Sequence, residues 1–159
     1  RTLKANEGIK FSSINVKDDW SKAFGGLTTN SENIVFDKDG NATVAETGLY
    51  LITVDAVISK LTIEPAKVYG MGPVFGGWEV AAKYPFTINA DGTASITAPN
   101  AGDIRMYTAI EGVDWWQAEY NVFDGKIQYR GNGGDQAAVP VTAGQVVTLN
   151  FNAGTGTIQ

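Results

Sequence analysis

Apolar and polar residues alternate with a period of two along much of this chain, the pattern of β-strands that bury one face. Turn dipeptides such as Asp39-Gly40 and Asp91-Gly92 separate the alternating segments. Short strands at this spacing predict an all-β fold arranged as a β-sandwich. The predicted strands are at 42–44, 49–55, 60–64, 67–70, 84–89, 94–98, 103–109, 138–141 and 145–152, with a short last strand up to 158.

The second part of the chain partly repeats the first. Segments at 9–11, 52–55 and 61–63 recur in the same order at 104–106, 147–150 and 156–158. A repeat at a fixed spacing predicts tandem copies of one structural unit. Residues 66–103 have almost no counterpart in the first part, and Pro65 marks a short, stiff boundary. We therefore predict a partial β-sandwich module at 1–65, truncated at its N-terminus, and a complete module at 66–159, together forming the end of a longer protein.

Composition excludes several functional classes. The 159 residues include no cysteine and no histidine, which removes disulfides, thiolate chemistry and the commonest general base and metal ligand. The formal net charge of −5 argues against a nucleic-acid surface, which needs clustered Lys and Arg. No uninterrupted apolar run is long enough to span a membrane. We expect no cofactor and no nucleic-acid partner.

Tryptophans indicate a binding site. Trp78 follows the glycine-rich turn Phe75-Gly76-Gly77, which we expect to hold its ring away from the core. Trp115 and Trp116 are adjacent, so in a strand one would face the core and the other would face solvent. An exposed indole ring needs a partner, and the C–H face of a sugar packs flat against it. Groups that could hydrogen-bond the sugar hydroxyls are Arg105, Tyr107, Gln117, Tyr120, Arg130 and Asn132.

Acidic residues do not predict a catalytic or metal site. Glu111, Asp114 and Glu119 are close in sequence, and a glycosidase needs two carboxylates that flank the bond it cleaves. Acidic loop residues are usually only solvated, so we expect no enzyme activity. The segment at 37–41 faintly resembles a calcium loop, but it lacks the later ligands and the closing Glu, and a hairpin turn explains it better.

Several short motifs occur in the order found in a known family. They are Val68-Tyr69-Gly70, Gly76-Gly77-Trp78, an Asp-Gly turn, Ile104-Arg105-Met106, Trp116 with Tyr120, and a closing Gly-x-Val-x-Thr strand. Together with matching segments of the first copy, they resemble the carbohydrate-binding modules of the SusE/SusF family, outer-membrane starch-binding lipoproteins of Bacteroides-type bacteria. The resemblance covers nearly the whole chain.

This resemblance implies immunoglobulin-like β-sandwich modules without catalytic activity. It implies a platform of two aromatic rings, with Trp78 as the first and Trp116 or Trp115 as the second, and with Arg105 as the basic residue that hydrogen-bonds sugar hydroxyls. Tyr120 is a further candidate. Lys10 and Trp20 hold the matching places in the first copy, where the segment for the first tryptophan is missing.

The partner that the resemblance favours is an α-glucan, bound as an oligosaccharide or polysaccharide at the surface of the outer membrane. It also implies a transporter complex as a partner, and a lipid anchor upstream of this chain. Three alternatives stay open: specificity for another glycan, a structural spacer that uses the tryptophans as protein contacts, and an accessory domain of a glycosidase. In a purely structural interpretation, Trp116 is a core tryptophan and the other tryptophans cover edges of the sandwich.

Overall fold

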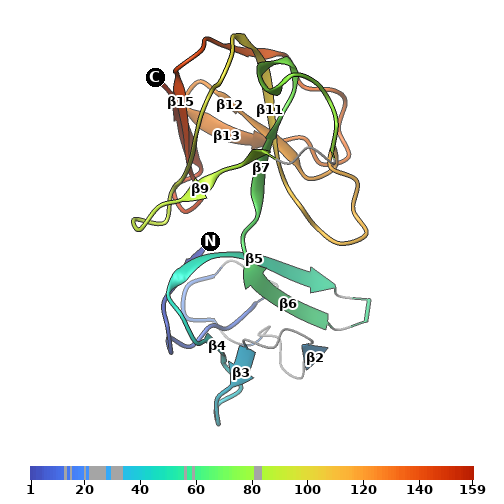
Figure 1. Ribbon diagram of the computed structural model, residues 1–159. Helices are drawn as coiled ribbons and strands as arrows, with labels where there is room; N and C mark the ends of the chain where they lie inside the picture. Colours follow the sequence, from blue (N-terminus) through green and yellow to red (C-terminus); the bar gives the residue numbers. More distant parts are fainter. Residues whose placement is uncertain are drawn as a thin grey trace. The chain divides into compact units, whose positions relative to one another are not determined.

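The computed structural model describes residues 1–12, 14, 16–19, 21, 28–29, 34–55, 57–58, 60–80 and 84–159. The chain divides into two compact units, Arg1–Pro65 and Ala66–Gln159 (Figure 1). The predicted all-β fold is confirmed, because the regular elements formed by these described residues are strands apart from one 3-10 turn, η1 (Pro73–Phe75). The described residues include no helix long and apolar enough to cross a membrane.

The described part of the first unit contains a four-stranded sheet and a two-stranded hairpin. The sheet has the order β1-β5-β6-β2, and β3 pairs with β4. The turn between β3 and β4 is fastened by the Asp37 carboxylate, which accepts hydrogen bonds from the backbone N–H groups of Asp39 and Asn41. The strands are β1 (Thr2–Leu3), β2 (Thr28–Thr29), β3 (Ile34–Phe36), β4 (Ala42–Val44), β5 (Gly48–Asp55) and β6 (Lys60–Pro65). The core consists of Leu3, Ile34, Ala42, Val44, Tyr50, Leu61 and Ile63.

The second unit folds one continuous series of paired strands into a sandwich-like arrangement. Its order is β8-β7-β11-β12-β13-β16-β15-β10-β9. β14 pairs with the first three residues of β11, Gly102, Asp103 and Ile104. The early strands are β7 (Val68–Met71), β8 (Tyr84–Pro85), β9 (Thr87–Ile88), β10 (Ala94–Thr97) and β11 (Gly102–Thr108). The later strands are β12 (Glu119–Phe123), β13 (Lys126–Tyr129), β14 (Val139–Val141), β15 (Val146–Asn150) and β16 (Thr155–Ile158).

Alternation along β11 and β12 separates a core face from a polar face. Ile104 and Met106 of β11 are fully buried, and Met106 lies opposite Tyr120 of β12. Tyr107, the residue after Met106, lies opposite Glu119, so these two side chains share the other face. Arg105 and Glu119 of the candidate site lie on this second face. The hairpin of β12 and β13 falls within a stretch where the sequence pattern predicts no strand.

The hairpins β5–β6 and β15–β16 pair in equivalent registers. Ile52 lies opposite Ile63 in the first hairpin, and Val147 lies opposite Ile158 in the second. Each residue of the second pair is 95 positions after its counterpart in the first pair. A shift of the strand pairing by one residue would turn the apolar side chains of a strand to the opposite face of the sheet, so equivalent registers in the two hairpins are not expected by chance. We propose on this basis that the two hairpins are the same element in two copies of one module.

Candidate functional site

A short closed turn after β7 presents Trp78. Gly72 and Gly77 exchange two backbone hydrogen bonds of 2.9 and 3.1 Å, which close the turn around η1. Gly76 ends η1 in the left-handed conformation, at φ 91°. Val74 and Phe75 are buried and anchor the turn, so Trp78 follows directly from a fixed backbone. Trp78 is 49% exposed.

Trp115 and Trp116 lie in a series of turns between β11 and β12, not in a strand. The expectation that one faces the core and the other faces solvent is therefore wrong, since strand alternation does not apply to turns. Both are partly buried and both line the same hollow. The Trp115 ring lies 6.5 Å from that of Trp78, with planes inclined by 27°. The edge-on ring of Tyr107 supports Trp115, with centroids 6.2 Å apart.

Two arginines lie against these rings. The guanidinium carbon of Arg105 is 5.9 Å from the centroid of Trp78, and that of Arg130 is 5.2 Å from the centroid of Trp116. Both distances are within the range of a cation–π interaction. The indole rings thus lie beside charged groups that restrict their positions.

Together these groups form an open hollow of about 580 Å³. The structure brings together four of the five predicted site residues. Arg130, predicted as a possible hydrogen-bond partner of the sugar, also lines the hollow, and so does Asp135, which sequence reasoning missed. The lining consists of Trp78, Arg105, Trp115, Trp116, Arg130 and Asp135.

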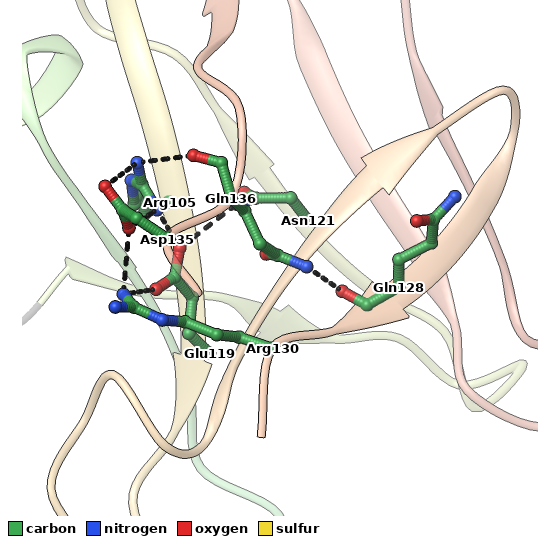
Figure 2. A network of polar contacts seen from close by, with 7 residues as sticks. All are labelled: Arg105, Glu119, Asn121, Gln128, Arg130, Asp135 and Gln136. Atoms are coloured by element: carbon green, nitrogen blue, oxygen red, sulfur yellow. Dashed lines mark hydrogen bonds and ion pairs between the residues drawn. The ribbon is translucent and has the colours of Figure 1, made fainter. Parts of the chain in front are cut away.

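A network of ion pairs joins the charged residues that line the hollow to the buried Glu119 (Figure 2). The Glu119 carboxylate is 0% exposed and accepts hydrogen bonds from both Arg105 and Arg130, the latter at 2.8 Å. Asp135 pairs with the same two arginines, each through Nη1 at 2.9 Å. Asn121 donates a further hydrogen bond to Glu119. Burial alone would lower the pKa of Arg105, but the hydrogen bonds and charges of Glu119 and Asp135 outweigh it and raise the pKa.

Gln136 fastens the segment that carries Asp135 over this face. Its carbonyl oxygen accepts a hydrogen bond from Arg105 Nη2, and its side-chain nitrogen donates to the carbonyl oxygen of Gln128. The Gln136 side-chain oxygen also accepts from Asn121. Glu119 and Asn121 are fully buried under this segment.

Tyr120 does not line the hollow. It lies on the core face of β12 with 1% exposure, and its ring packs against those of Tyr129 and Phe151. Its hydroxyl is hydrogen-bonded to that of Thr108, and burial raises its pKa. In the first unit Lys10 is exposed, whereas Trp20 lies outside the described residues.

The acidic residues have different surroundings. Glu111 and Asp114 are exposed, as expected for loop residues. Glu119 is not a solvated loop residue as predicted, because it belongs to β12 and is buried between two arginines. Among the described residues, no group of three or more acidic side chains is placed to hold a metal ion.

Comparison with known proteins identifies related modules. A sequence model described as SusF/SusE starch-specific carbohydrate-binding modules matches residues 67–157. Outer membrane protein SusF of Bacteroides thetaiotaomicron is 35% identical over 171 residues, which cover 98% of this chain and 35% of that protein. The crystal structure of SusF from the same organism superimposes with a TM-score of 0.83 at 34% identity, over 99% of this chain and 38% of that chain. The chain thus spans about a third of the length of this relative.

We expect the turn that carries Trp78 to be sensitive to substitution at Gly72. Gly72 has φ 113°, and an added Cβ would lie 2.6 Å from the carbonyl oxygen of Asp103. Gly76 also has a positive φ, but an added Cβ there meets nothing within 4 Å. Gly76→Ala should therefore cost about 1 kcal/mol of unfolding free energy, and Gly72→Ala about 3 kcal/mol or more. Urea unfolding followed by tryptophan fluorescence measures both, and equal effects would contradict the predicted clash.

Glu119→Gln should destabilise the second unit by about 3 kcal/mol, because it leaves two buried guanidinium groups with a single, largely exposed carboxylate. Glu111→Gln removes the same charge from an exposed turn and should change the unfolding free energy by less than about 0.5 kcal/mol. The same urea titration compares the two variants. A Glu119→Gln protein as stable as the Glu111→Gln protein would show that the buried carboxylate is dispensable.

Proposed function

Because this chain belongs to the family of SusF/SusE starch-specific carbohydrate-binding modules, we propose that it binds starch and its maltooligosaccharides through the hollow formed by the three tryptophans. The family consists of binding modules, so the chain is a carbohydrate-binding protein and not an enzyme. The observation that carries the proposal is the pair of rings of Trp78 and Trp115, which are close and inclined to each other by 27°.

An inclined pair of rings suits a curved polysaccharide. An α-linked glucan coils, so that successive sugar rings present their C–H faces at an angle to one another. Two indole planes that diverge by 27° can each cover one such face, whereas a flat, extended glycan would contact only one of them fully. Half of the Trp78 surface is available for this contact. Burial of apolar surface against the rings provides the main attraction.

The arginines keep this platform in place. In this proposal Arg105 is the basic residue of the site, and its guanidinium group lies against Trp78. Trp116 extends the platform from its position on Arg130. A platform whose rings are already fixed loses little conformational entropy when a sugar binds.

We propose further that the chain acts at the outer surface of the outer membrane, in a system for polysaccharide uptake; the location is supported by its relative, which is named an outer membrane protein. A lipid anchor upstream and a transporter complex as a partner belong to the same proposal. Binding at one shallow site is weak, because sugar hydroxyls must exchange water for protein partners. Further modules on the same chain would raise the effective affinity.

Isothermal titration with maltoheptaose tests the proposed platform. Trp78→Ala should weaken binding at least tenfold, since it removes half of the ring pair. Tyr129→Ala is the matched control, because Tyr129 is an exposed aromatic of the same unit that does not line the hollow. It should leave the affinity within twofold.

Two other outcomes would overturn this proposal. If the unmodified chain binds oligosaccharides from fructan, xylan or mannan but not maltoheptaose, the hollow is specific for another glycan. If it binds no glycan of this panel, the tryptophans serve a different purpose, such as contact with another protein.

A further inference from the structure

The charged groups around the hollow differ sharply in exposure. The side chains of Arg105 and Arg130 are 11% and 16% exposed, and Glu119 is entirely buried. The side chain of Asp135 is 68% exposed. A ligand that enters the hollow therefore meets the Asp135 carboxylate more readily than either guanidinium group.

The terminal N–H groups of Arg105 are already occupied. A guanidinium group has five N–H donors, and four of them are on its two terminal nitrogens. Nη1 donates to Glu119 and to Asp135, and Nη2 donates to Asp135 and to the carbonyl oxygen of Gln136. A hydrogen bond from either nitrogen to a sugar would have to replace one of these four.

Asp135, in contrast, has accepting capacity left. A carboxylate offers about four lone-pair sites on its two oxygens. Oδ1 accepts a hydrogen bond of 2.9 Å from Arg105 Nη1 and lies 2.9 Å from Arg130 Nη1. Oδ2 accepts only a longer hydrogen bond, of 3.3 Å, from Arg105 Nη2. Oδ2 can therefore accept another hydrogen bond, and the two arginines hold it in a fixed orientation.

We propose that Asp135 Oδ2 accepts a hydrogen bond from a hydroxyl group of the bound glycan, which makes Asp135 a specificity-determining residue of the site. This inference rests on the proposed function and deepens it. An ionised carboxylate accepts hydrogen bonds and donates none, so the site selects neutral glycans whose hydroxyl donors lie beside the face that stacks on Trp78. A glycan with acidic sugars would bring its own carboxylates against Asp135 and is disfavoured.

A double-mutant cycle between protein and ligand tests this contact. The ligands are β-cyclodextrin, a closed α-glucan, and its derivatives deoxygenated at C2, C3 or C6. Asp135→Ala should weaken binding of β-cyclodextrin about tenfold, as should removal of the one hydroxyl that donates to the carboxylate. In the Asp135→Ala protein the same deoxygenation should then have almost no effect, since its partner is already gone.

Controls separate a contact from a general disturbance of the site. Glu111→Gln removes a negative charge outside the hollow and should bind all four ligands as the unmodified chain does. If Asp135→Ala lowers the thermal stability, the cycle is repeated with Asp135→Asn. The asparagine keeps the size of the side chain and one carbonyl acceptor, so part of the deoxygenation penalty should remain.

The outcomes distinguish this inference from the function on which it rests. If each deoxygenation weakens binding by the same factor in the unmodified and Asp135→Ala proteins, the carboxylate does not touch a sugar hydroxyl. The inference is then wrong, while starch binding stands. If the unmodified chain binds neither maltoheptaose nor β-cyclodextrin, the proposed function itself is wrong and the inference is lost with it.

Discussion

The buried carboxylate of Glu119 is the constraint on which the site depends. A charge without solvent must be compensated by nearby opposite charges and hydrogen bonds. Here two guanidinium groups and the side-chain amide of Asn121 provide that compensation. Because the partners come from β11, from β12 and from the residue that follows β13, one interaction fixes the relative positions of three adjacent parts of the sheet. Asp135 closes the network from the other side, where it faces solvent.

This network also explains how the site can leave large aromatic rings accessible. Glu119 binds Arg105 and Arg130, and each arginine lies against one indole ring, that of Trp78 or that of Trp116. The closed turn between Gly72 and Gly77 restricts the backbone next to Trp78. The rings are thus held from two directions, and they do not need to collapse onto one another to become ordered. A rigid apolar surface of this kind is open to a ligand that brings its own apolar face.

The sequence predicted those parts of the fold in which alternation reflects burial. Strands such as β5, β11 and β15 have apolar residues on the core face and are found close to their expected bounds. The hairpin of β12 and β13 was missed because Glu119 and Asn121 are buried, so two polar residues occupy positions that look solvated in sequence. Their burial depends on the segment around Asp135 and Gln136, which no local pattern places over the sheet.

The residues of the candidate site could likewise be predicted from the sequence only in part. Trp78 could be found from the glycine-rich turn before it, and Trp115 and Trp116 from their unusual adjacency, although their turn conformation was not predicted. Asp135 left no signal, because its role arises from arginines that are 5 and 30 positions away in sequence.

Arg105 shows why a residue's place in a motif does not fix its contacts. A basic residue next to an aromatic platform suggests a donor for sugar hydroxyls, but the terminal nitrogens of Arg105 are saturated by partners from its own chain. Hydrogen bonds that are already satisfied offer little net energy to a ligand, since binding would exchange one partner for another. Among the two arginines and two carboxylates of this network, the most exposed side chain is that of Asp135, at 68%, which is why the proposed polar contact is assigned to a carboxylate and not to Arg105.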